Sequence, residues 1–279
     1  EDDPGRAARH AGAVARLDAV ASERLRPVAA FDPETMGRFL AVTTLWRGKP
    51  TLNWLELSLL YDAQRGTFTP IGSRGGTAPA ATVLPDAYRD DPEIQRAYLL
   101  ALQEIADPRY LAGVREMLAA RWAAEAWSLS GAGAFDAAWA ALTRHHAQIQ
   151  RMLEPARTLY ADADEADGTL ILRLRPTQRF PVEIIGFDVG GAFLPVDTLW
   201  IRPETVSGLV PTADRSVVLA GFTGAMAPSV ELRIPLTAMP VAMEGRRDEI
   251  RVLTRLWGLD DQELVMPVRE AYPLISGAP

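Results

Sequence analysis

Residues 168–189 read GTLILRLRPTQRFPVEIIGFDV, and this stretch decides the fold of the second half of the chain. In TLILRLR (169–175) apolar side chains recur at every second residue, which is the period of a half-buried β-strand. A Pro-containing turn separates this run from a second one, VEIIGFDV (182–189). We therefore expect a mostly antiparallel β-sandwich after Gly168, without long helices and with its own core. The expected core includes Leu170, Leu172, Ile184 and Leu232.

Four more runs with strand character follow at short spacing and are separated by Pro, Gly and Asp residues. They are SVVLAG (216–221), SVELRIPL (229–236), EIRVLTRLW (249–257) and ELVMPV (263–268).

The segment immediately before this region, ADADEADG (161–168), is acidic, lacks large apolar residues and ends in glycine. These features predict a linker or exposed turn between two domains, residues 1–163 and 164–279. Its Asp spacing is superficially similar to a calcium-binding loop. However, Ala166 stands at the third expected Asp position, and Arg173 stands where a bidentate Glu is needed. We therefore predict no metal site here.

The first half of the chain has a helical pattern. Residues 6–27 are rich in Ala and Arg, and a long helix is expected over residues 135–160. Three Asp-Pro pairs predict helix starts, because Asp caps free N–H groups and Pro suits the first helical position. The pairs begin at Asp32, Asp91 and Asp107. Phe31 and Met36 have the spacing of a hydrophobic staple around the first pair.

Composition excludes several kinds of protein and site. The formal net charge of −7 argues against a general nucleic-acid-binding protein. The chain contains no cysteine, which excludes disulfides and zinc–thiolate sites. No apolar run approaches the roughly 20 residues that a membrane span needs. The sequence begins at Glu1 without Met, so we expect it to be a fragment or a processed form.

Common catalytic motifs are missing from the sequence. It has no G-x-S-x-G or H-E-x-x-H motif, and Lys49, the single lysine, lacks the surroundings of a Walker A loop. His145 and His146 are adjacent, so on a helix their side chains point about 100° apart and do not readily share a metal. His146 also follows the apolar stripe of the long helix. We expect both histidines to be structural.

The stretch YDAQRGTFTPIGSRGG (61–76) predicts a β-hairpin. Residues 57–61 and 67–71 are expected to pair across a turn at residues 63–66, where Gly66 tolerates a positive φ. The second strand then runs directly into Ser73 and Arg74.

With its upstream context, residues 31–76, this region resembles the spore-coat CotH kinase family, extracytoplasmic relatives of protein kinases. In that family a helix with an Asp cap and an RFLA motif leads to a catalytic segment and then to a tyrosine-rich hairpin. Residues 91–111 are similar to the family's following helices, and residues 181–191 to the β-domain that often trails such kinases. The matching residues are Phe31-Asp32, Arg38-Phe39-Leu40-Ala41, Asn53-Trp54, Tyr61-Asp62, Arg65-Gly66 and Pro70-Ile71-Gly72.

The resemblance implies an α+β multidomain protein, in which a helical domain like a kinase C-lobe precedes the antiparallel β-sandwich-like domain. It also implies that the catalytic residues have been lost. The family's catalytic Asp falls near Thr51, its magnesium-binding Asn near Glu56, and its second metal-binding Asp at Ser73 or Arg74. A guanidinium at that last position would repel a divalent cation.

We therefore expect a catalytically degenerate protein with a binding or structural role, and no cofactor. The resemblance implies an extracytoplasmic location, in the periplasm or at the cell surface, and a protein or cell-envelope partner. One alternative is an active atypical protein kinase, which would need ATP and magnesium. Another is a carbohydrate-binding or adhesion module, which exposed Trp200 and Trp257 on the β-domain would favour.

Overall fold

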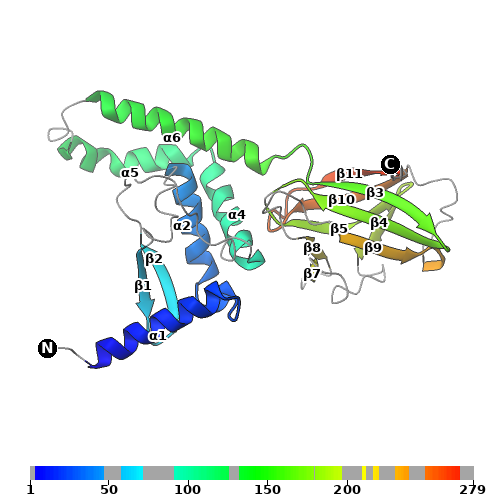
Figure 1. Cartoon of the computed structure of the whole chain (residues 1–279). Coiled ribbons are helices and arrows are strands. Elements are labelled where there is room, and N and C mark those ends of the chain that lie inside the picture. Colours follow the sequence, from blue (N-terminus) through cyan, green and yellow to red (C-terminus); the bar gives the residue numbers. More distant parts are fainter. Residues whose placement is uncertain are drawn as a thin grey trace, which may run out of the picture. The chain divides into compact units, whose positions relative to one another are not determined.

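The structure, a computed structural model, has an α+β fold (Figure 1). The chain divides into two compact units, residues 1–154 and 155–279. The boundary predicted after residue 163 falls inside a strand of the second unit. The structure describes residues 4–46, 58–71, 91–125, 132–178, 180–196, 209–211, 216–219, 230–238 and 249–270.

The described part of the first unit consists of helices and one β-hairpin. In chain order its elements are α1 (Pro4–Ala21), the 3-10 helix η1 (Pro27–Ala29), α2 (Pro33–Trp46), β1 (Ser58–Asp62), β2 (Thr67–Ile71), α4 (Pro92–Ala106), α5 (Tyr110–Glu125) and α6 (Ala132–Leu153).

Helices α2 and α4 begin at the proline of the first two Asp-Pro pairs, as predicted, whereas α5 begins at Tyr110, two residues after Pro108. Each Asp side chain accepts a hydrogen bond from a backbone N–H group near the helix start. Asp32 Oδ1 accepts from the N–H of Thr35 at 2.8 Å, and Asp91 Oδ1 accepts from that of Glu93 at 3.0 Å. Asp107 Oδ1 accepts from the N–H of Arg109 at 2.7 Å. These carboxylates satisfy donors that have no partner within their helix.

Helices α2 and α4 make the main helix–helix contact of the first unit. Gly37 allows their backbones to approach closely, because a Cβ at this position would lie 2.5 Å from the carbonyl carbon of Ala97. The Thr44 and Tyr98 hydroxyl oxygens lie 2.6 Å apart across the same contact. The buried core beside it includes Phe31 and Met36, as their staple spacing predicts.

Two helix boundaries differ from the prediction. The helix expected over residues 135–160 is α6, which ends at Leu153, and Leu159 and Tyr160 belong to a strand instead. Pro155 explains the difference, because a proline disfavours the α conformation at the residue before it. The helix expected over residues 6–27 ends at Ala21.

The described part of the second unit is built almost entirely of strands. They are β3 (Leu159–Ala166), β4 (Thr169–Pro176), β5 (Val182–Val189), β6 (Ala192–Pro195), β7 (Leu209–Pro211), β8 (Val217–Leu219), β9 (Val230–Pro235), β10 (Ile250–Leu256) and β11 (Leu264–Glu270), with a short 3-10 helix, η5, at Leu236–Ala238.

The strand order is β7-β8-β5-β10-β11-β3-β4-β9, with β6 paired to β5. The pairs are antiparallel except that β11 pairs with β3 in parallel, so the sheet is mostly antiparallel, as predicted. Strand β11 contacts β10 through residues 264–267 and β3 through residues 268–270, so it links the two halves of the sheet.

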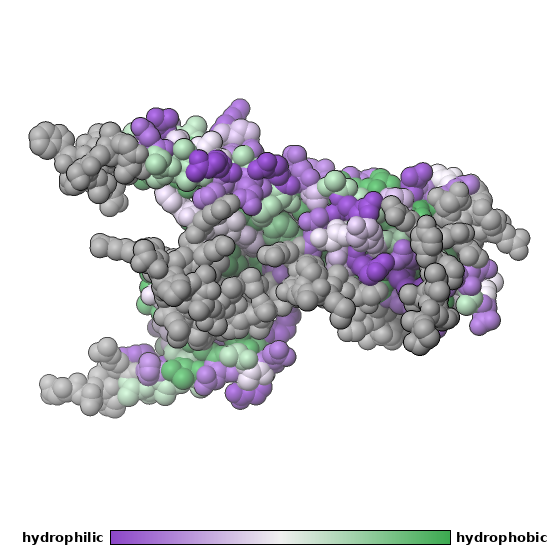
Figure 2. Space-filling view, turned by 45° about the horizontal axis from the view of Figure 1, so that its top comes forward, coloured by the Kyte–Doolittle hydropathy of each residue, from purple (hydrophilic) through white to green (hydrophobic). Residues whose placement is uncertain are grey.

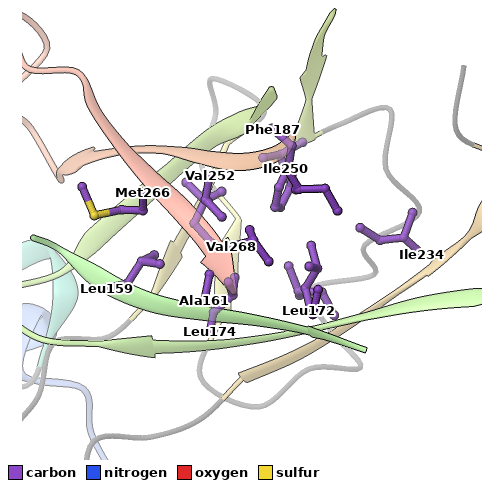
Figure 3. Packing of buried hydrophobic residues seen from close by; sticks show 14 of the residues in the cluster. Leu159, Ala161, Leu172, Leu174, Phe187, Ile234, Ile250, Val252, Met266 and Val268 are labelled. Carbon is purple, nitrogen blue, oxygen red and sulfur yellow. The ribbon is translucent and has the colours of Figure 1, made fainter. Parts of the chain in front are cut away.

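A hydrophobic core fills the space between these two halves (Figure 3). The predicted core residues Leu170, Leu172, Ile184 and Leu232 are all buried in it. Side chains from β3 and β4 face those from β5, β10 and β11, as the labelled residues in Figure 3 show. The switch to a two-residue period therefore marks a unit with its own core.

The acidic segment 161–168 is not a linker. Its first six residues belong to β3, and Asp167 and Gly168 form the turn to β4, both with positive φ. Ala161 and Ala163 point into the core, while Asp162 and Asp164 face outward. Asp162 Oδ2 accepts a 2.7 Å hydrogen bond from Arg175 Nη2, so arginines of β4 balance the acidic face.

Candidate functional site

The hairpin β1–β2 is antiparallel, as predicted, with Ser58 opposite Ile71 and Asp62 opposite Thr67. Gly66 closes the turn with a φ of 67°, a conformation that glycine adopts without strain. Asp62 Oδ1 accepts a hydrogen bond from the N–H of Gln64 at 2.9 Å, which stabilises the turn. The hairpin is thus specified by its own turn chemistry.

The outer edge of β2 attaches the hairpin to the segment before α2. The N–H of Phe68 donates to Ala30 O at 2.7 Å, and Phe31 and Phe68 form a parallel bridge with ring centroids 5.6 Å apart. Because the N–H of Phe68 points away from β1, the N–H position of Pro70 points the same way. Proline therefore costs the hairpin no hydrogen bond here.

Helix α1 lies against the turn of the hairpin. The Arg16 guanidinium donates through Nη2 to Ala29 O, and a Cβ at Gly66 would lie 3.3 Å from Arg16 Cζ. Arg16 Nε is buried and has no hydrogen-bond partner. Arg16 thus joins α1, η1 and the hairpin turn into one framework.

Helix α6 supplies polar side chains to the C-terminal ends of two other helices. His145 Nδ1 lies 2.8 Å from Leu45 O at the end of α2. His146 Nε2 lies 3.2 Å from Asp107 O, and Gln150 Nε2 donates to Ala106 O at 2.9 Å, both at the end of α4. Helix ends carry carbonyls without helical partners, so these contacts give both histidines a structural role, as expected.

The predicted site residues Thr51, Glu56, Ser73 and Arg74 lie outside the described residues, and so does Lys49. The structure describes the elements that hold the two segments containing them. Helix α2 ends at Trp46 and β1 begins at Ser58, on either side of the first segment. Strand β2 ends at Ile71 and α4 begins at Pro92, on either side of the second. We call this set of elements, with Arg16, the helix–hairpin framework.

Apolar side chains are exposed on this framework. Leu60 of β1 is 61% exposed and Ile71 of β2 is 47% exposed. They share the outer face of the hairpin, since Leu60 pairs with Thr69 and Ile71 with Ser58. Trp46, at the end of α2, is also exposed.

Two ionisable groups of the first unit have shifted pKa values. Hydrogen bonds from the Thr35 side chain and N–H, with a smaller contribution from the Arg65 charge, lower the pKa of Asp32. Partial burial, together with the charge of Glu104, raises the pKa of Tyr110. Both shifts suit structural groups. A capping carboxylate that is held ionised is a poor general base, since an effective base has a pKa near the working pH.

Among the described residues no three His, Asp or Glu side chains are grouped so that they could hold a metal ion. In the segment compared with a calcium loop, Asp162 pairs with Arg175, and Asp164 Oδ2 lies 3.9 Å from Arg173 Nη2. Arginine competes with a cation for such carboxylates. The arrangement on β3 and β4 is therefore an ion-pair ladder on the outside of the sheet.

Among the described residues of the second unit, Glu183 is the most buried charged group, and the sequence did not predict it. Its side chain is 2% exposed and contacts Arg255, which is 18% exposed. Arg255 Nε donates to Glu183 Oε2 at 2.6 Å, and Nη2 donates to Oε1 at 3.1 Å. Ser216 Oγ donates to the same Oε1, and Arg255 Nη1 lies 3.3 Å from Asp260 Oδ1. The carboxylate is fully paired, which indicates a structural role.

The aromatic residues proposed for sugar stacking give little support to a carbohydrate site. Trp257 is half-buried, and Trp200 lies outside the described residues. Tyr160 is exposed, and the guanidinium carbon of Arg157 lies 4.7 Å from its ring centroid. On the face shown in Figure 2, hydrophobic residues of the described part form small groups between hydrophilic ones.

Comparison with known proteins gives no family assignment, since no protein-family model and no curated protein matches the chain. Among the described helices none is both long enough and apolar enough to cross a bilayer.

Proposed function

We propose that the chain is a non-catalytic relative of the CotH kinases, with a binding or structural role at the bacterial cell surface or in the periplasm. The observation that carries this proposal is the helix–hairpin framework. A capped helix, a hairpin with a glycine turn and a second capped helix follow one another in the order that the resemblance implies.

The residues between these elements argue against catalysis. Phosphoryl transfer depends on positioned charge, and magnesium must neutralise the phosphates. Thr51, Glu56, Ser73 and Arg74 stand where the resemblance places the Asp, Asn and Asp that would bind it. Glu56 is the one carboxylate in this set. The exposed Trp46, Leu60 and Ile71 beside these segments suit a protein partner better than a nucleotide.

We expect no magnesium-dependent phosphoryl transfer and weak or absent binding of ATP with magnesium. Magnesium needs carboxylate or carbonyl oxygens as ligands, and a guanidinium supplies none. Calorimetry with ATP and magnesium, followed by a phosphotransfer assay on the full-length protein, measures both properties. Micromolar, magnesium-dependent binding that weakens in Glu56→Ala would contradict the prediction and favour the active-kinase alternative.

Restoration variants test the kinase relationship itself. Arg74→Asp alone should not restore binding, because the positions of Thr51 and Glu56 would still lack the family residues. The triple variant Thr51→Asp, Glu56→Asn and Arg74→Asp should gain magnesium-dependent ATP binding if the resemblance is correct. The family's second metal-binding Asp falls at Ser73 or Arg74, so a matched triple variant carries Ser73→Asp in place of Arg74→Asp. If neither triple variant binds, the proposed relationship loses its support.

A further inference from the structure

The first and last described strands of the second unit, β3 and β11, lie side by side and run parallel. Ala161 pairs with Val268, Asp162 with Arg269, and Ala163 with Glu270. Ala161 and Val268 are also neighbours in Figure 3. In a parallel pair, the start of one strand and the end of the other lie at opposite ends of the pair. A pull on both ends of the unit therefore acts along the strands.

From this topology we propose that the second unit carries tension between its two ends, with β3 and β11 loaded in shear. The hydrogen bonds of a parallel pair are evenly spaced along the strands, so a force along the strands loads them together. A force across the strands would break them one at a time. Each strand also has an antiparallel partner on its other side, β4 for β3 and β10 for β11. These partners resist the same sliding.

The residues just before β3 are held by a separate set of hydrogen bonds. Arg157 O accepts from Thr177 Oγ1 at 2.9 Å and from Gln178 Nε2 at 2.7 Å. The N–H of Thr177 donates to Thr158 O at 2.8 Å. The Thr158 and Thr254 hydroxyl oxygens lie 2.6 Å apart in the buried interior. Tension that arrives from the first unit meets these bonds before it reaches the strand.

Ion pairs on the outer face hold β3 to the rest of its sheet. Arg175 pairs with Asp162 across β4 and β3, and Arg173 contacts both Asp164 of β3 and Glu231 of β9. Exposed pairs of this kind add little to equilibrium stability. They do connect three strands across the direction of sliding, so they supplement the backbone hydrogen bonds under load.

Single-molecule force spectroscopy on the full chain tests the proposal. The chain has no native cysteine, so introduced cysteines give unique attachment points. Ala156→Cys, exposed just before β3, and a cysteine added after Pro279 load the pair in shear. Ala156→Cys with Asp261→Cys, exposed before β11, places both attachments at the same end of the pair, so this control peels the strands apart.

At equal pulling speed, we expect a higher unfolding force in shear than in peeling, because shear loads the hydrogen bonds of the parallel pair together and peeling loads them one at a time. Equal forces in the two geometries, or a lower force in shear, would overturn the proposal. The test is independent of the proposed function, because it requires neither ATP nor a kinase relationship. A negative result in the force measurement would therefore not contradict the proposed function, and a failed kinase relationship would not contradict the proposed role in carrying tension.

A pair of variants separates force resistance from ordinary stability. Arg269→Pro removes a backbone N–H from the bridged stretch of β11 and should lower the shear force towards the peeling value. Val252→Ala creates a cavity in the β10 core and should lower the equilibrium stability, with a smaller effect on the shear force. A shear force that follows equilibrium stability in both variants would also contradict the proposal.

Discussion

Arg255→Met is expected to lower the free energy of unfolding of the second unit by about 3–5 kcal/mol. The substitution keeps an apolar stem of similar length but removes both guanidinium bonds to Glu183. The Glu183 carboxylate, 2% exposed, would then stay buried and keep the hydrogen bond that Ser216 Oγ donates to its Oε1. A buried charge without its partner carries most of its desolvation penalty uncompensated.

A matched control is Arg173→Met in β4. Arg173 is 39% exposed and contacts Asp164 and Glu231 at 3.9 and 3.5 Å, so its loss should cost at most about 1 kcal/mol. Adding Glu183→Gln to Arg255→Met should recover much of the loss, because the neutral amide can still accept from Ser216. Urea titration followed by hydrogen exchange in β5 and β10 measures these differences. An Arg255→Met loss no larger than that of Arg173→Met would contradict the prediction.

Gly37→Ala is expected to destabilise the first unit by about 2 kcal/mol, although alanine is the better helix former. The new Cβ would lie 2.5 Å from the carbonyl carbon of Ala97 and 2.6 Å from the backbone N of Tyr98. Backbone atoms in the middle of α4 cannot rotate away as a side-chain end can. The two helices must therefore separate, which also strains the contact between Thr44 and Tyr98.

Gly113→Ala in α5 is the matched control, because a Cβ there would meet no atom within 4 Å. This variant should gain up to about 1 kcal/mol from helix propensity alone. The free energies of unfolding of both variants follow from urea titrations monitored by hydrogen exchange in α2 and α4. Similar effects of the two substitutions would show that the close approach of α2 and α4 is not tightly constrained.

Local sequence patterns predicted the elements that are stabilised by residues close together in the sequence. The caps at Asp32 and Asp91 required only Asp-Pro spacing, and the hairpin required only its glycine turn. Strands β4, β5, β8, β9, β10 and β11 followed from their two-residue period, whereas the short strands β6 and β7 were not predicted.

Strand β3 was missed because, after Leu159, its buried face consists of alanines. The A-D-A-D pattern does have the period of a strand, but Ala161 and Ala163 are too small to mark an apolar face. The charges of the outward aspartates are balanced by Arg173 and Arg175. These arginines lie next to the aspartates only after β3 and β4 have paired. The parallel pairing of β3 with β11 joins segments about 100 residues apart, and no local pattern encodes it.

For the candidate site, sequence predicted the helix–hairpin framework but not the polar contacts that hold it. Arg16 is one of three arginines in its helix, and its contact with Ala29 and the Gly66 turn depends on tertiary packing. Glu183 lies within an apolar run, and this position was the only feature of the sequence that indicated a buried charge. Its partner Arg255 is a neighbour only once β5 pairs with β10.

The contacts of α6 with two helix ends bear on the order in which the first unit folds. The bonds of His146 and Gln150 to the end of α4 close loops of 39 and 44 residues, whereas that of His145 to Leu45 spans 100. Shorter loops lose less chain entropy on closure, so we expect α4 and α6 to associate before α6 reaches α2. Pulse-labelled hydrogen exchange would show this as earlier protection of α4 than of the last turn of α2. During synthesis, the end of α2 must therefore wait for about a hundred further residues before its last carbonyls gain their protein partner.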